Sequence, residues 1–156
     1  MRDDVIVRPA VVSEREQLEA LQRRASLNNL GDRQALLAHP DAIELPLEQI
    51  REGGVYVAEV AGSIRGFAAI LPRDDGDSEL DALFVEPDVW RRGIGRELVE
   101  HSAAAAKAAR AESLHVVGNS HAEGFYRACG FQMLGTRKTR FWVGLLMKRV
   151  LRLTPS

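Results

Sequence analysis

Cysteine is nearly absent from this chain, which carries only Cys129 among its 156 residues. One cysteine cannot form a disulfide within the chain, so a disulfide-stabilised fold is excluded. This usage fits a reducing compartment. We expect Cys129 to be a small packed residue without chemistry of its own.

The chain also lacks an excess of charge and a long apolar run. Its formal net charge is −1, which gives no support for a nucleic-acid or membrane partner. The longest uncharged apolar run, Phe141 to Met147, is far shorter than the about 20 residues that span a bilayer. The N-terminal segment M-R-D-D-V is charged and has no signal-peptide core. We therefore expect a soluble, cytoplasmic protein.

A metal site is not indicated either. His39, His101, His121 and Cys129 show no metal-ligand spacing with one another. We therefore expect no metal.

The length and the apolar content of the chain are sufficient for one folded domain. With 156 residues and 46% hydrophobic content, a single domain over residues 1–156 with its own core is expected. Apolar runs bounded by turn residues predict strands over 5–7, 55–60, 64–71, 79–85, 114–117, 131–136 and 139–147. Helical spacing predicts helices over 13–25, 32–40, 46–50, 94–109 and 122–128, the first opened by a Ser13–Glu16 capping box. Hairpins and strand–helix–strand units together predict an α/β (α+β) fold, a mixed sheet covered by helices.

The most informative stretch runs from Leu80 to Val99, L-D-A-L-F-V-E-P-D-V-W-R-R-G-I-G-R-E-L-V. An apolar strand is followed by a turn, two glycines and the start of a helix. Backbone N–H groups at such a helix N-terminus bind anions, phosphates above all. Gly93 and Gly95 let the backbone approach a ligand, and Arg91, Arg92 and Arg96 add positive charge. We expect this turn to hold a pyrophosphate.

Two segments in order carry a family resemblance. The strand–turn–helix above is similar to the acyl-CoA motif Q/R-x-x-G-x-G/A of the GNAT acyltransferases, which use acetyl-CoA. The later segment N-S-H-A-E-G-F-Y-R-A-C-G-F, Asn119 to Phe131, resembles the N-x-x-A-x-x-F-Y-x-x-x-G-F of the same family. The order of predicted elements agrees from Val5 to Met147. One position departs, because Trp90 stands where the family has Gln or Arg.

The resemblance implies a fold and a cosubstrate site. The fold is a mostly antiparallel central sheet that opens as a V between two central parallel strands, with helices on both faces. The backbone of Leu83, Phe84 and Val85 would pair with the pantetheine arm of acetyl-CoA. The pyrophosphate would be held by the N–H groups of Arg91, Arg92, Gly93, Ile94, Gly95 and Arg96. Asn119 would bond the cosubstrate, cap the helix that follows, or do both.

The resemblance also assigns catalytic roles. Tyr126 matches the family tyrosine that protonates the departing thiolate, and its normal pKa of about 10 would keep it protonated at neutral pH. Glu79 matches the catalytic glutamate of the histone acetyltransferases and is the first candidate for the base. Asp81 on the same strand face, His115 and a water molecule stay open as alternatives.

These roles describe an N-acetyltransferase in which a primary amine attacks acetyl-CoA directly. Acidic residues near the central strand favour a small cationic amine or a lysine side chain as the acceptor. The alternative is a non-catalytic CoA-binding module that acts as a metabolic sensor. A homodimer stays open.

Overall fold

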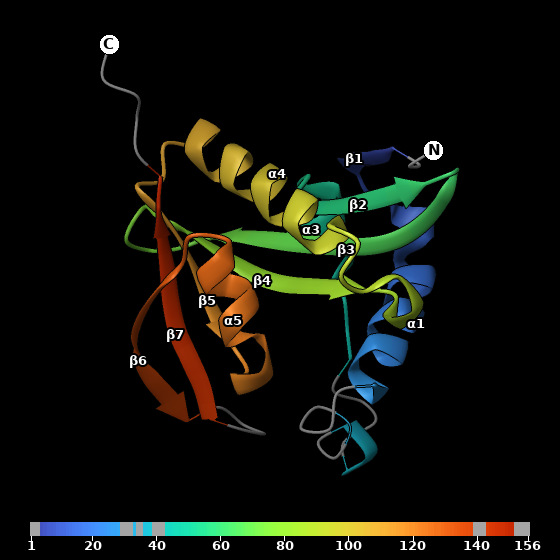
Figure 1. The fold of residues 1–156 in the computed structure, drawn as a ribbon. Coiled ribbons are helices and arrows are strands. Elements are labelled where there is room, and N and C mark those ends of the chain that lie inside the picture. Colours follow the sequence, from blue (N-terminus) through green and yellow to red (C-terminus); the bar gives the residue numbers. More distant parts are fainter. Residues whose placement is uncertain (1–3, 29–32, 34–35, 39–42, 139–142, 152–156) are drawn as a thin grey trace. The chain divides into compact units, whose positions relative to one another are not determined.

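The computed structural model describes residues 4–28, 33, 36–38, 43–138 and 143–151 (Figure 1). Within these residues the strands form a seven-stranded sheet in the order β1-β2-β3-β4-β5-β7-β6. Their bounds are β1 Val5–Pro9, β2 Val55–Val60, β3 Ser63–Pro72, β4 Ser78–Val85, β5 Ser113–Gly118, β6 Gln132–Lys138 and β7 Val143–Val150. β4 and β5 pair in parallel, whereas β1–β2, β2–β3, β5–β7 and β6–β7 pair antiparallel. The predicted mixed, mostly antiparallel sheet is confirmed.

The helices lie close to their predicted positions. Their bounds are α1 Arg15–Leu27, α3 Leu47–Arg51, α4 Ile94–Ala108 and α5 Glu123–Ala128, with 3-10 turns at Val12–Glu14, Pro87–Val89 and Ser120–Ala122. The cap at Asp32 and the stop at Pro40 that were predicted for a second helix lie outside the described residues. No helix within the described ranges combines the length and the apolar character needed to cross a membrane.

The predicted capping box at the start of α1 is wrong. Ser13 lies inside the 3-10 turn Val12–Glu14, and α1 begins after it at Arg15. Glu14, rather than Glu16, accepts the Val11 N–H, at 2.9 Å. Arg8 of β1 forms an ion pair with the same carboxylate at 2.7 Å. This contact holds the residues before α1 against β1, and α1 begins two residues later than predicted.

Residue contacts divide the chain into two compact units, Met1–Ala69 with Ala82–Val99 and Ile70–Asp81 with Glu100–Ser156. The single domain over residues 1–156 stays a prediction.

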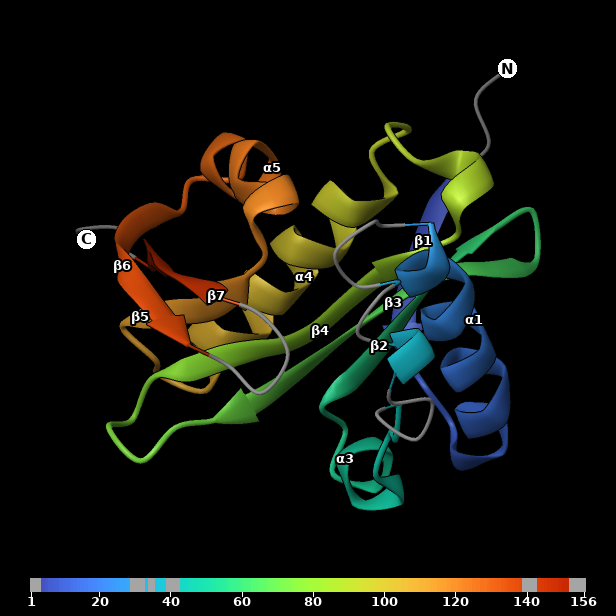
Figure 2. The ribbon, with the colours of Figure 1, turned by 90° about the horizontal axis from the view of Figure 1, so that it is seen from below.

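In the first unit, α1 and α3 cover one face of β2 and β3 (Figure 2). The alternation of strand side chains directs apolar groups of both strands toward these helices. One buried cluster joins Leu18 and Leu21 of α1, Ile50 of α3, Val55 and Val57 of β2, and Phe67 of β3. This cluster is the core that holds the first unit together.

The other face of β3 packs closely on α4. A Cβ atom at Gly66 would lie 3.0 Å from the Phe84 carbonyl oxygen of β4, 3.1 Å from Leu98 Cδ1 and 3.3 Å from Ile94 Cγ2. A glycine therefore lets the first turns of α4 reach the sheet. Helices cover both faces of this part of the sheet, as predicted.

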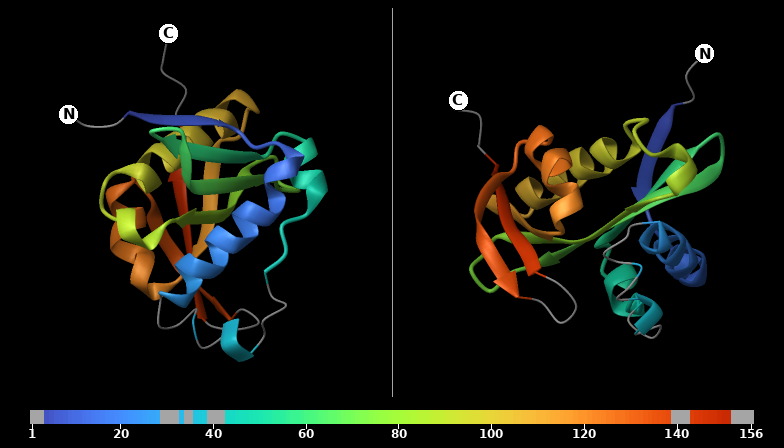
Figure 3. Two further views of the ribbon diagram at one scale, coloured as in Figure 1. Left: turned by 90° about the vertical axis from the view of Figure 1, so that its right-hand side faces the viewer. Right: turned by 60° about the horizontal axis from the view of Figure 1, so that its bottom comes forward.

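In the second unit, β5 lies between β4 and β7, and the β6–β7 hairpin, drawn in orange and red in Figure 3, completes the edge. Leu114 and Val116 of β5 are buried, as are Ala103 and Ala106 of α4 and Met147 of β7. His115 and Val117 alternate with the buried positions and are half-buried. One face of β5 therefore packs into the apolar core, and the other face presents the half-buried His115 side chain.

The parallel pairing is short. It joins Ser78, Glu79 and Leu80 of β4 to Leu114, His115 and Val116 of β5. β4 continues to Val85, and its side chains are half-buried from Ala82 onward. The V-shaped opening predicted between the two parallel strands stays a prediction.

Gly66 gives a test of the packing between β3 and α4. Gly66→Ala should lower the free energy of unfolding by about 1–3 kcal/mol, because the new methyl group meets a backbone carbonyl that cannot move aside. Gly124→Ala in α5 is the matched control, because nothing lies within 4 Å of its added Cβ. It should gain about 0.5–1 kcal/mol from helix propensity. Urea unfolding checks both values, and equal effects of the two changes would contradict the packing.

Candidate active site

The turn after β4 is tied back to its own strand. The Trp90 indole N–H donates a hydrogen bond to the Val85 carbonyl oxygen at 2.7 Å. The Glu86 N–H donates to the Arg65 carbonyl of β3 at 2.8 Å, and the Glu86 carboxylate pairs with Arg24 of α1 at 2.8 Å. Trp90, the residue that departs from the family motif, thus holds the turn against the end of β4. Its indole N–H already occupies one acceptor position of the Val85 carbonyl.

The backbone beyond Trp90 opens toward solvent. Arg91 has φ 68 and Gly93 has φ 84, and nothing lies within 4 Å of a Cβ placed on Gly93. The first hydrogen bond of α4 runs from the Glu97 N–H to the Gly93 carbonyl at 3.0 Å. N–H groups earlier in this turn have no carbonyl one turn before them within the helix. With the positive end of the helix dipole, they suit an anion.

The three arginines that were predicted beside the anion have exposed side chains. Arg91, Arg92 and Arg96 all lie in this exposed turn or in the first turn of α4, and Ile94 between them is buried under the helix. The structure therefore places positive charge at the N-terminus of α4. Their contact with a pyrophosphate stays a prediction.

Tyr126 lies in α5, in the second unit, with 7% of its surface exposed. Its ring lies against the β5 backbone, since a Cβ atom on Gly118 would be 3.0 Å from Tyr126 Cε2. Phe125 and Phe131 pack edge-on, with ring centroids 5.3 and 5.4 Å from that of Tyr126. No described residue forms a hydrogen bond with the Tyr126 hydroxyl.

Burial changes the acidity expected for Tyr126. Burial removes water from the Tyr126 phenol and raises its pKa above the normal value of about 10 that its residue type predicts. The hydroxyl is therefore protonated at neutral pH, and it is a weaker acid than a phenol in water.

Asn119 and Cys129 have the structural roles that were expected. The Asn119 side-chain oxygen accepts the Ala122 N–H at 3.1 Å and caps the 3-10 turn before α5. A bond from Asn119 to the cosubstrate stays a prediction. Cys129 is buried at the end of α5, with 6% of its surface exposed.

The predicted acidic strand face is present on β4. Glu79 is half-buried and Asp81 is exposed, with buried Leu80 between them. Glu79 Oε1 lies 3.6 Å from Nη1 of Arg73, which also pairs with Asp75 at 3.2 Å. One guanidinium thus faces two carboxylates, and the surroundings of Glu79 are partly neutralised.

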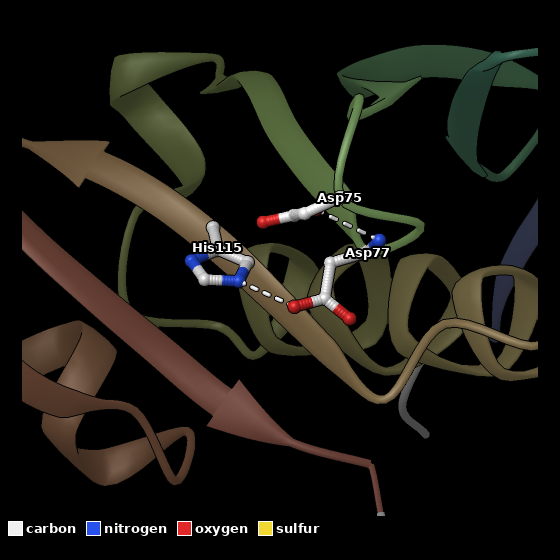
Figure 4. A group of neighbouring side chains, drawn as sticks. All are labelled: Asp75, Asp77 and His115. Atoms are coloured by element: carbon white, nitrogen blue, oxygen red, sulfur yellow. Dashed lines mark hydrogen bonds and ion pairs between the residues drawn. The ribbon is translucent and has the colours of Figure 1, made fainter.

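A hydrogen-bonded pair next to Glu79 went unnoticed in the sequence. Asp77 and His115 point toward one another (Figure 4), with His115 Nε2 2.8 Å from Asp77 Oδ2. The other Asp77 oxygen accepts the N–H groups of Glu112 and Ser113 at 3.0 and 3.1 Å. The hydrogen bond from His115, then the two backbone bonds, lower the pKa of Asp77. His115 was one of the candidate bases in the sequence, but its contact with Asp77, 38 residues away, was not predicted.

Asp75 completes this group from the same loop. One ligand-type atom from each of Asp75, Asp77 and His115 lies within 4.8 Å of the others. Asp75 also accepts the Asp77 N–H at 3.0 Å, and Arg73 lowers the pKa of Asp75 by hydrogen bonding. Hydrogen bonds with protein donors engage both carboxylates. The absence of a metal stays a prediction.

Comparison with known proteins identifies the family. The acetyltransferase (GNAT) family matches residues 20–131, which is most of the chain. The chain therefore belongs to the GNAT acetyltransferase family, and the resemblance read from the sequence is confirmed.

Individual relatives agree with this family. Over 56 residues the chain is 41% identical to the peptidyl-lysine N-acetyltransferase YjaB of Salmonella typhimurium, covering 36% of this chain and 37% of that one. The chain thus spans little more than a third of the length of the curated relatives it matches.

Solved structures share the fold. A GCN5-related N-acetyltransferase from Rhodopseudomonas palustris has a TM-score of 0.78 and 18% identity, covering 97% of this chain and 98% of that one. The protein yncA from Salmonella typhimurium, solved with its cofactor acetyl-CoA, has a TM-score of 0.71 and 16% identity, covering 98% and 97%. At these identities the likeness concerns the fold alone.

The hydrogen bonds of Asp77 with Glu112, Ser113 and His115 predict that the fold loses stability in acid. The pKa of Asp77 is lower in the folded state than the ordinary aspartate pKa of about 3.9. The ionised carboxylate therefore stabilises the fold above about pH 3.9. This stabilisation is lost as the pH falls through the lower folded-state pKa. Asp77→Asn should cost about 1–2 kcal/mol near neutral pH, since hydrogen bonds to a charged group weaken. This difference from the unaltered chain should shrink below about pH 4.

Urea unfolding across pH measures this difference. Asp74→Asn, at an exposed position of the same loop, is the matched control and should change little. A cost for Asp77→Asn that stays constant down to pH 2 would contradict the role of the ionised carboxylate.

Proposed function

We propose that this chain transfers the acetyl group of acetyl-CoA to a primary amine, that of a lysine side chain or a small cationic molecule. The observation that carries the proposal is the open N-terminal turn of α4, with Gly93 at φ 84, in a chain of the GNAT family. The match to a peptidyl-lysine N-acetyltransferase supports lysine as the acceptor. We further propose that residues 1–156 act as one domain, in the cytoplasm.

The chain's own groups fit acetyl-CoA at two points. The first turn of α4 offers N–H groups and three arginines to a pyrophosphate. The buried Tyr126 hydroxyl, which has no hydrogen-bond partner among the described residues, offers a donor to the thioester sulfur. Acetyl-CoA supplies the activated acetyl group when it is bound.

Each predicted site residue then has a role in the proposal. The backbone of Leu83, Phe84 and Val85 pairs with the pantetheine arm, and Asn119 bonds the cosubstrate with its amide. Tyr126 holds the proton that passes to the departing sulfur. Glu79 and Asp81 face the amine on β4, where their charge attracts a cation, and Glu79 is the first sequence-based candidate for the base.

Binding of CoA tests the turn. CoA at 100 times its Kd should stabilise the protein by about 2.7 kcal/mol through mass action. Gly95→Val should lose the resulting rise in Tm, because its branched side chain blocks close approach of the pyrophosphate. Gly135→Val in β6, where nothing lies within 4 Å of a Cβ, is the control and should keep the rise. A full CoA-dependent rise in folded Gly95→Val would overturn the pyrophosphate assignment.

Turnover tests Tyr126. Tyr126→Phe keeps the ring packing and removes only the hydroxyl, so kcat for thiol release should fall about 10²–10⁴-fold while CoA affinity holds. Tyr56→Phe makes the same change at the other tyrosine, in β2, and should leave kcat nearly unchanged. Unchanged turnover in Tyr126→Phe with chemistry rate-limiting would leave Tyr126 as a core aromatic.

A further inference from the structure

We infer that His115, held by Asp77, is the base that takes the proton from the acceptor ammonium, and that Glu79 beside it contributes charge. The inference rests on the proposed function and deepens it. It makes His115 a catalytic residue and Asp77 a positioning residue.

The hydrogen bond to Asp77 determines which nitrogen of His115 carries the proton. The lowered pKa of Asp77 keeps its carboxylate ionised near neutral pH, and an ionised carboxylate can only accept a hydrogen bond. The 2.8 Å contact with Asp77 Oδ2 is therefore donated by Nε2–H of His115. In the neutral ring the lone pair then lies on Nδ1.

This lone pair is available. No described residue forms a hydrogen bond with His115 Nδ1, and 15% of the His115 side-chain surface is exposed. The ring is thus held at one nitrogen and open at the other. A carboxylate that orients an imidazole and stabilises its cationic form is the arrangement that general-base histidines use in catalysis.

His115 also lies on the acidic strand face. It pairs in register with Glu79 of β4 on one side and with Lys148 of β7 on the other, and register partners share a face. Among the described residues, the contacts and the register place three carboxylates near the ring, those of Asp75, Asp77 and Glu79, and two cations, Arg73 and Lys148. Three carboxylates outnumber the two cations, which favours the approach of an ammonium group.

Glu79 is less suited to the proton transfer. Its carboxylate already faces a cation, the Arg73 guanidinium at 3.6 Å, whereas His115 Nδ1 has no hydrogen-bond partner among the described residues. Imidazole is the side chain that ordinarily gains and loses a proton close to neutral pH. His115, held by Asp77, is therefore better suited to act as the base, and the charge of Glu79 is suited to attract the cationic acceptor.

The proton balance is as follows. One proton passes from the ammonium nitrogen to Nδ1 of His115, which frees the nitrogen lone pair. The N–C bond to the acetyl carbon forms and the C–S bond breaks, while Tyr126 gives its proton to sulfur. The second proton leaving the nitrogen replaces that of Tyr126, and His115 releases its proton to water.

The test compares pH profiles of kcat/KM for thiol release, with acetyl-CoA and a lysine-containing peptide. His115→Gln keeps a side-chain N–H for Asp77 and cannot titrate, so activity should fall about 10²-fold or more and the acid limb should disappear. Added imidazole should partly restore His115→Ala. Glu79→Gln should raise KM for the peptide several-fold and keep the acid limb.

The variant Asp77→Asn distinguishes a role of Asp77 in positioning His115 from a purely structural role. Loss of the anion disfavours the imidazolium, so the acid limb should move to lower pH while the plateau falls about 10- to 100-fold. A purely structural role would reduce activity in proportion to folded protein and leave the limb in place. The CoA-induced rise in Tm should persist in every variant, which confirms an intact cosubstrate site.

Each contrary result has its own meaning. An acid limb retained in His115→Gln, or lost in Glu79→Gln, overturns the inference and leaves the proposed function standing. Activity that EDTA abolishes and a divalent metal restores also overturns it, in favour of a metal at this group. No thiol release by the unaltered chain with any lysine peptide or polyamine overturns the proposed function, and the inference with it.

Discussion

A single carboxylate bonds the two strands of the parallel pair to one another at the end where β4 begins. No hairpin can align parallel strands, so another contact must set their register. Asp77 stands directly before β4, and its carboxylate binds the N–H groups of Glu112 and Ser113, where β5 begins, and the His115 ring within β5. These three bonds support the register in which Ser78 pairs with Leu114 and Glu79 with His115. The same register places the buried side chains of both strands on one face and the titratable ones on the other.

This alignment connects stability with chemistry. A carboxylate that holds two backbone donors cannot rotate freely, so the imidazole bonded to its second oxygen is also held in one orientation. A different constraint acts in the first unit, where Gly66 admits the start of α4 onto the sheet and Trp90 anchors the turn to Val85. In the first unit the constraint holds the turn proposed to bind an anion, and in the second unit it holds the groups proposed to transfer a proton.

Much of this could be predicted from the sequence, because local patterns carry it. The strand–turn–helix at Gly93 and the helix bearing Tyr126 have fixed spacings, and alternating side chains placed β2, β3 and β4 within about two residues. The Asp77–His115 contact spans 38 residues and depends on the register of a parallel pair, which one sequence does not reveal. The start of α1 was misplaced for a similar reason, because Arg8 of β1 recruits Glu14. The raised pKa of Tyr126 comes from burial, which the motif does not show.

The central claim is that this chain acetylates an amine and does not merely bind CoA. Mass spectrometry of peptides incubated with the purified chain and acetyl-CoA tests it most directly, using one peptide with a lysine and a blocked N-terminus and its partner with a free N-terminus and no lysine. We expect one acetyl group on the lysine peptide, with one free CoA thiol released for each acetyl group transferred. A chain that gains stability from CoA and leaves both peptides unmodified, together with polyamine acceptors, would contradict it and identify a sensor.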